Sequence, residues 1–174
     1  GWRGPMLHRA IEQFLTDVYW GDLDFLLVDL PPGTGDVAIS LGQLLPKAYS
    51  LVVTTPQPAA SDVAERSGAI GLQTGQKIIG VVENMSHLLL NGKRQNIFGE
   101  GGGDAVAKRL SELSGENVEV LARIPMDEKL REASDSGKPN DSLPDAGPEL
   151  SKLIDKISKI PIGLDGKKLK LNLG

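Results

Sequence analysis

The residues best placed to do chemistry follow an apolar run near the N-terminus. The run spans residues 25–28 and ends in Asp29, and Gly33 and Gly35 lie a few positions later. A carboxylate held at the end of a strand can orient a water bound to Mg²⁺. Glycine amides, which lack the bulk of a Cβ, can approach a phosphate closely. This pattern is typical of a Walker B segment, in which Asp29 would be the metal-binding and catalytic residue.

Two other interpretations of these residues remain open. In the simpler one, Asp29 only ends a strand and Asp36 caps the helix that follows a tight turn. In the other, Gly33-x-Gly35-x-x-Ala38 is a variant of a dinucleotide fingerprint. Three residues separate that pattern from the strand, however, and the next strand ends in Thr54-Thr55-Pro56 without a carboxylate for a ribose. The spacing therefore argues against a dinucleotide site.

Alternating apolar runs and helical patterns determine the expected fold. Short runs rich in Val, Ile and Leu predict buried parallel strands at residues 25–29, 51–55, 78–84 and 118–124. Helical patterns are predicted at residues 5–18, 37–45, 61–73, 104–113 and 148–160. This order implies βαβ units and an α/β fold with a parallel sheet covered on both faces. Such sheets bind ligands at the carboxyl ends of their strands, so the residues just after each strand are the candidate site.

Composition narrows the classes of partner. The chain has 174 residues and a formal net charge of −4, which argues against nucleic acid as a general partner. The lysines near the C-terminus belong to a polar tail, residues 161–174. No apolar run approaches the roughly 20 residues that span a bilayer, so we expect no membrane association. There is no cysteine, which suits a reducing compartment, and a cytoplasmic location is expected.

Six segments of the chain are similar to one known family. They are Trp2-Arg3-Gly4-Pro5-Met6, the stretch from Asp22 through Asp36, Val53-Thr54-Thr55-Pro56-Gln57, Glu83-Asn84-Met85-Ser86, Phe98-Gly99-Glu100-Gly101-Gly102-Gly103 and Ile124-Pro125-Met126-Asp127. In this order they resemble the Mrp/ApbC family of deviant-Walker P-loop ATPases, which is close to MinD and ParA and is associated with iron–sulfur cluster assembly and carriage. The resemblance implies that residues 1–160 are the C-terminal half of an ATPase domain with a doubly wound parallel sheet of the P-loop NTPase (MinD/ParA-like) type.

The resemblance also implies a role for each matched residue. Asp29 would be the switch II aspartate near Mg²⁺. Gly33 would offer its N–H group to the γ-phosphate of ATP, with Pro31 in the same nucleotide-binding loop. Asn84 would hydrogen-bond the adenine edge, for which an amide has a suitable donor and acceptor. Pro125 and Asp127 would lie beside the base.

Structural interpretations stand beside these roles. Asn84 would serve equally as a turn or cap residue, and Asp127 as the N-cap of a helix over residues 128–133. The glycine segment, which we define as Phe98–Gly103, opens a helix and could hold an anion. We interpret it as a structural turn.

One departure from the family concerns the phosphate-binding loop. No stretch matches the Walker A pattern G-x-x-x-x-G-K-[ST], and in the family that loop lies upstream of every segment matched here. We therefore expect a truncated chain without the Walker A strand, which does not hydrolyse ATP on its own. Because the absent strand would lie beside residues 25–29, we predict that strands 25–29 and 51–55 pair with each other or swap with a second copy.

A second departure concerns the iron–sulfur cluster. Many family members carry Cys-x-x-Cys where this chain has residues 87–97, a stretch with no thiol. Asn91-Gly92 instead predicts a hairpin turn, and His87 is a single histidine. Cluster binding through this motif is therefore not expected. The family implies a homodimer and iron–sulfur assembly or client proteins as partners, and the alternative function is a non-catalytic interaction or scaffold module.

Overall fold

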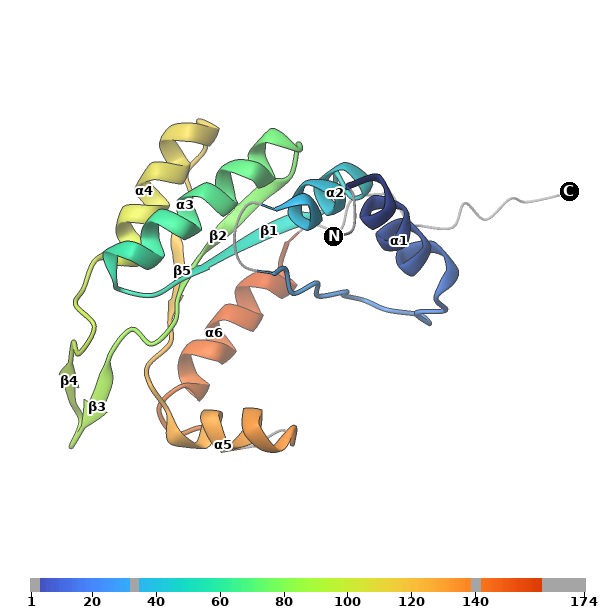
Figure 1. Cartoon of the computed structure of the whole chain (residues 1–174). Coiled ribbons are helices and arrows are strands. Elements are labelled where there is room, and N and C mark those ends of the chain that lie inside the picture. The colour runs from blue at the N-terminus through green and yellow to red at the C-terminus, as the bar shows by residue number, and fades with distance from the viewer. Residues whose placement is uncertain (1–3, 32–34, 139–141, 161–174) are drawn as a thin grey trace, which may run out of the picture.

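Strand-forming apolar runs and the helices between them build an α/β fold, as predicted. The computed structural model describes residues 4–31, 35–138 and 142–160. Three parallel strands form the main sheet in the order β1 (Tyr49–Thr54), β2 (Lys77–Glu83) and β5 (Val120–Arg123), as Figure 1 shows. The strands β3 (Leu88–Leu90) and β4 (Lys93–Gln95) form a separate antiparallel hairpin.

The helices cover both faces of the main sheet. They are α1 (Gly4–Asp17), α2 (Asp36–Leu44), α3 (Pro58–Gln73), α4 (Gly102–Ser114), α5 (Glu128–Ser136) and α6 (Gly147–Ser158). In Figure 1, α3 and α4 lie side by side on one face, and α6 packs against the other face near β5. The described part of the chain is therefore wound on both sides of its sheet, as expected for parallel strands.

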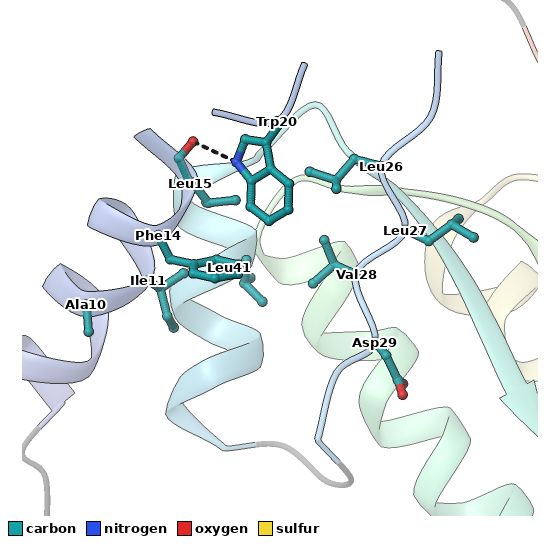
Figure 2. Close-up of a pocket in the computed structure, with 10 residues that line it drawn as sticks. All are labelled: Ala10, Ile11, Phe14, Leu15, Trp20, Leu26, Leu27, Val28, Asp29 and Leu41. Carbon is teal, nitrogen blue, oxygen red and sulfur yellow. Dashed lines mark hydrogen bonds between the residues drawn. The ribbon is translucent and has the colours of Figure 1, made fainter. Parts of the chain in front are cut away.

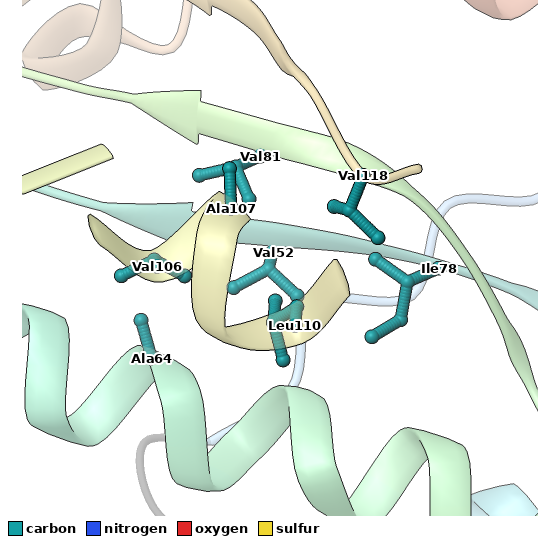
Figure 3. Packing of buried hydrophobic residues seen from close by; sticks show 8 residues of the cluster. All are labelled: Val52, Ala64, Ile78, Val81, Val106, Ala107, Leu110 and Val118. Atoms are coloured by element: carbon teal, nitrogen blue, oxygen red, sulfur yellow. The ribbon is translucent and has the colours of Figure 1, made fainter. Parts of the chain in front are cut away.

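The main core lies between α3, α4 and the sheet. It contains Val52, Ala64, Ile78, Val81, Val106, Ala107, Leu110 and Val118 (Figure 3). Gly68, within α3, has a packing function, although glycine is unfavourable in a helix interior. A Cβ on Gly68 would lie 2.6 Å from Cδ2 of the buried Leu110, so glycine lets α3 and α4 pack this closely without displacing that side chain.

On the opposite face, α6 packs against β5 and closes its outer edge. The backbone N–H of Arg123 donates to Oε2 of Glu149 at 3.1 Å, and Nζ of Lys156 donates to the carbonyl oxygen of Leu121 at 2.9 Å. These side chains form hydrogen bonds with backbone groups on the outer edge of β5. Without α6, those groups would be available to another strand.

The prediction of a strand at residues 25–29 is wrong for this structure. The segment is extended, but it pairs with no strand in the described part of the chain and all of its residues are exposed. A β-strand requires hydrogen bonds from a neighbouring strand, and β1 pairs only with β2. The predicted re-pairing of strands 25–29 and 51–55 is therefore absent. Swapping with a second copy stays a prediction.

The other predicted elements form with boundaries shifted by a few residues. One shift concerns a cap: Gly35 is the N-cap of α2, and Asp36 is the first helical residue rather than the cap. The predicted helices at 61–73 and 104–113 begin earlier, at Pro58 and Gly102. Within the described ranges, no helix has the length and apolar character needed to cross a membrane.

Candidate functional site

The carboxyl ends of β1, β2 and β5 meet at one edge of the sheet, where the loops are joined by backbone hydrogen bonds. The N–H of Asn84 donates to the carbonyl oxygen of Thr54 at 2.8 Å, and the N–H of Ser86 donates to that of Ile124 at 2.9 Å. The turn after the central strand is thus held from both sides. This edge is where an open parallel sheet binds its ligands.

Asn84 lies in this turn with an exposed side chain. Its Oδ1 accepts a hydrogen bond from the N–H of Met85 at 2.9 Å, and Met85 has a φ of 49°. Its Nδ2 has no partner among the described residues. The structural interpretation of Asn84 as a turn residue is confirmed. The free Nδ2 leaves the amide able to contact a ligand as well.

Asp127 joins two helices through its carboxylate. Its Oδ1 accepts from the N–H groups of Lys129 and Leu130, which confirms the predicted N-cap of α5. Its Oδ2 accepts from the N–H groups of Asp145 and Ala146, just before α6. Partial burial raises the pKa of Asp127, but the four backbone hydrogen bonds outweigh burial and lower the pKa. The neighbouring Pro125 is buried.

Glu83 has a role at this edge that no sequence motif predicts. It is the last residue of the central strand β2, and its side chain is 1% exposed. Its Oε1 accepts from the hydroxyl of Ser86 at 2.6 Å, and its Oε2 accepts from the N–H of Gly103 at 2.7 Å. Nε of Arg123 lies 4.0 Å from Oε1. The sequence indicates the contact between Glu83 and Gly103 only indirectly. Each residue lies in one of the segments that resemble the family, but nothing in the sequence pairs them.

The glycine segment acts as a structural turn, as interpreted from the sequence. A Cβ on Gly102 would lie 2.6 Å from the carbonyl oxygen of Thr55, and one on Gly103 would lie 2.9 Å from Oε2 of Glu83. The N-terminus of α4 therefore already receives a carboxylate from within the chain, the favourable charge at that helix end. The hydroxyl of Thr55 is buried and lacks a hydrogen-bond partner in the described part of the chain.

Asp29 lines a groove to which Asn84 does not contribute. The groove has a volume of about 480 Å³ and lies between α1 and the extended segment. In Figure 2, Leu26 and Val28 point toward the side chains of α1, whereas the carboxylate of Asp29 points away from them. None of Asn84, Pro125 and Asp127 lines this groove. Pro31 is exposed at the end of the segment, and Gly33 lies outside the described residues.

The hairpin that replaces the Cys-x-x-Cys interval forms as predicted. Asn91 and Gly92 have φ values of 51° and 73°, the left-handed pair that a tight two-residue turn requires. His87 precedes the hairpin, and its Nδ1 is buried with no hydrogen-bond partner among the described residues. Burial and, secondarily, the charge of Arg94 lower the pKa of His87. In the described ranges, no three His, Cys, Asp or Glu side chains gather as a metal site.

Known proteins that resemble this chain carry a consistent description. The iron–sulfur cluster carrier protein of Mycobacterium tuberculosis H37Rv is 59% identical over 175 residues, covering 98% of this chain and 46% of the relative. The protein of the same name from Bacillus subtilis is 42% identical over 127 residues, covering 72% of this chain and 34% of the relative. The chain thus spans about half or less of the length of these curated relatives.

Solved structures agree on the fold. A nucleotide-binding protein from Archaeoglobus fulgidus, solved in complex with ADP, is 34% identical with a TM-score of 0.64 over 80% of this chain and 56% of that protein. The cell division ATPase MinD of Pyrococcus furiosus has a TM-score of 0.62 at 23% identity, over 91% of this chain and 60% of MinD, and supports the fold alone. Residues 1–160 match the family described as ParA, NUBPL iron-transfer P-loop NTPase, and the chain belongs to that family.

Proposed function

We propose that this chain forms the base-binding half of the ATP site in an iron–sulfur cluster carrier ATPase. The observation that carries this proposal is the exposed amide of Asn84, held in a fixed turn at the carboxyl end of the central strand. Its Oδ1 retains a lone pair and its Nδ2 is free among the described residues, so the group fits a purine edge. The ADP complex of the A. fulgidus relative supports a nucleotide as the ligand.

Asp29 and the loop after it would serve the phosphates. The carboxylate of Asp29 is exposed and accepts no hydrogen bond within the described residues, so it is available to a cation. Mg²⁺ commonly uses one or two carboxylates together with phosphate oxygens, and when bound it neutralises charge on the transferred phosphoryl group. Pro31 and Gly33 follow Asp29 in sequence, and we assign them to the same loop. Pro125 and Asp127 shape the base side, where Asp127 acts mainly by joining α5 and α6.

An iron–sulfur cluster does not fit the donors of this chain. Clusters are held by cysteine thiolates, and the sequence has none. We therefore derive no ligation step from these residues. In the complete protein, cluster ligands would come from outside this chain, and client proteins would be the acceptors.

Hydrolysis requires groups beyond this chain. The lysine and backbone amides of a P-loop supply most of the phosphate-binding energy in such enzymes, and the sequence lacks that loop. We propose that residues 1–160 are one half of the ATPase domain, that the chain alone is inactive, and that the complete cytoplasmic protein is a homodimer. The open outer edge of β1 and the unpaired segment 25–29 support an absent neighbouring strand.

A second function is favoured by the apolar groove beside α1. The groove and the unpaired segment expose Phe14, Leu26 and Val28, and exposed apolar patches mark interaction sites. A non-catalytic scaffold module would use this surface without binding a nucleotide.

Calorimetric titration of the full-length protein with ATP and Mg²⁺ separates the two functions. Asn84→Ala is expected to weaken ATP binding about tenfold, because one or two hydrogen bonds to the base are lost. Asn117→Ala is the matched control, since Asn117 is an exposed amide whose only side-chain hydrogen bond among the described residues goes to Glu119. Equal affinities for the two variants would refute the base contact, and no ATP binding by the wild type would favour the scaffold module.

A further inference from the structure

Glu83 is the most completely buried carboxylate among the described residues, and both of its oxygens have donors. Ser86, whose hydroxyl donates to Oε1, is 0% exposed, and the N–H of Gly103 donates to Oε2. A buried carboxylate is strongly unfavourable unless it is paired and hydrogen-bonded. Glu83 therefore holds the turn that follows β2 and the N-terminus of α4 in one fixed arrangement.

The turn held by Glu83 carries a strained backbone. Between the buried residues Glu83 and Ser86 lie the exposed Asn84 and Met85, and Met85 adopts a φ of 49°. A left-handed conformation at a non-glycine residue persists only where its surroundings fix it, and such strain gathers at ligand-binding sites. Here the two ends of the turn are anchored to the neighbouring strands, and the bond from Ser86 to Glu83 closes the turn from inside.

The strained backbone determines which way the Asn84 amide faces. The N–H of Met85 donates to Oδ1 of Asn84 at 2.9 Å. A flipped amide would place its NH₂ group against this N–H, so two donors would meet and the bond would be lost. The oxygen thus stays beside Met85, and the nitrogen stays on the other side of the amide plane.

An amide of fixed orientation distinguishes the two purines. Adenine presents a donor (N6) beside an acceptor (N7), which match the oxygen and nitrogen of an amide. Guanine presents two acceptors, O6 and N7, at the same positions. A freely flipping amide offers its nitrogen to either base, whereas a fixed amide pairs fully with adenine alone.

We propose that Glu83 is a positioning residue that makes the site selective for adenine over guanine nucleotides. It acts through Ser86 and Gly103, which lock the turn and so orient the Asn84 amide. This inference rests on the proposed function, because it assumes that Asn84 contacts the base.

Substitutions at Glu83 separate its hydrogen bonds from its charge. Glu83→Gln keeps both bonds, since Oε1 can accept from Gly103 while Nε2 donates to the oxygen of Ser86. Glu83→Ala removes both. Ser86→Ala removes one bond and leaves the carboxylate in place. Glu112→Ala is the control, because Glu112 lies on α4 in an exposed ion pair with Arg109.

The dissociation constants of ATP and GTP are measured for each variant of the full-length protein, with circular dichroism to show that each is folded. Glu83→Ala is expected to lower the preference for ATP over GTP about tenfold, and Ser86→Ala about threefold. Glu83→Gln and Glu112→Ala are expected to keep the wild-type ratio. A residue that only stabilised the fold would change the melting temperature and leave this ratio unchanged.

Three outcomes would overturn the inference. The first is a folded Glu83→Ala variant with the wild-type ratio. The second, decisive if Glu83→Ala does not fold, is a wild-type ratio in Ser86→Ala. The third is a wild-type protein that binds both nucleotides equally while Asn84→Ala still weakens ATP binding, which would leave the proposed function intact. If Asn84→Ala binds ATP as the wild type does, the proposed function itself fails.

Discussion

Single carboxylates in this chain differ in how fully their hydrogen bonds are satisfied. Those of Glu83 and Asp127 accept from donors within the chain at both oxygens. That of Asp29 accepts none within the described residues. Satisfied carboxylates stabilise the fold and are poor cation ligands, whereas an unsatisfied exposed one is free to bind Mg²⁺. The hydrogen bonds therefore give Glu83 and Asp127 a structural role, and the free carboxylate of Asp29 supports the Mg²⁺ site proposed for it.

Asp127→Asn is expected to lower the free energy of unfolding by about 1–2 kcal/mol, the usual range for a lost helix cap. The variant can still accept on one oxygen, but its NH₂ group faces donors where the second oxygen accepted. Urea denaturation at about pH 7 measures the change. Asp155→Asn is the control, because the exposed carboxylate of Asp155 pairs, among the described residues, only with Lys159 at the end of the same helix.

The effect of Asp127 also depends on pH. Its pKa is lowered in the folded chain, so its stabilisation is fully present above the ordinary value of 3.8 and is lost as pH falls through the lowered folded pKa. The difference in stability between wild type and Asp127→Asn is therefore expected to shrink between about pH 5 and pH 2. A difference that stays constant over that range would contradict the assigned hydrogen bonds.

Sequence patterns predict local roles at the residue scale but not long-range partners. The N-cap of Asp127 follows from the residues next to it, because capping is a contact within one helical turn. Its second pair of bonds, to Asp145 and Ala146, joins segments 18 and 19 residues apart. The role of Glu83 cannot be predicted from local patterns for the same reason, because Gly103, one of its partners, lies 20 positions away.

Among the elements, those whose stability is local were predicted best. The Asn91-Gly92 turn formed because its conformation depends on those two residues alone. The strand at residues 25–29 did not form, although its side chains alternate as in a strand, with Leu26 and Val28 inward and Leu27 outward (Figure 2). Its hydrogen-bonding partner is a separate strand, and no local pattern can supply it.

Leu27→Lys distinguishes the extended segment from a strand in a completed sheet. Leu27 is 87% exposed in the chain described here, so the variant is expected to change the free energy of unfolding by less than about 0.5 kcal/mol. If these residues form a covered central strand in a longer protein, as proposed, the same variant is expected to destabilise that protein by about 3 kcal/mol or more, because it buries an unpaired charge. Thermal unfolding of both lengths measures this, with Leu90→Lys at the exposed hairpin as the control. Equal small effects in both lengths would contradict a completed sheet.

For the molecule as a whole, the sheet has one closed edge and one open edge. Side chains of α6 form hydrogen bonds with the outer edge of β5. The outer edge of β1 has no neighbouring strand in the described part of the chain. The backbone carbonyl of Thr54 points toward the β2 side of β1, where it accepts from the N–H of Asn84. Because backbone groups of successive residues in a strand point to opposite sides, the N–H and carbonyl of Val53 point outward. An open edge of this kind attracts another strand.

Val53→Pro tests the open edge. Proline removes the outward N–H without breaking a bond to β2, so the chain is expected to remain folded. Sedimentation velocity over a concentration series is expected to show self-association of the wild-type chain and its loss in the variant. The exposed Val63→Ala on α3 is the control. A wild-type chain that stays monomeric over the whole concentration series would show that the outer edge of β1 does not mediate self-association.

The unpaired segment between α1 and α2 would also affect how the chain is handled in a cell. Proteases and chaperones bind substrates as extended, apolar, accessible stretches, and residues 25–30 have all three properties. A copy that lacked its complementary strand would present this stretch until it was degraded or assembled. In a completed sheet the same residues would be hidden, so docking of that strand would determine which copies survive.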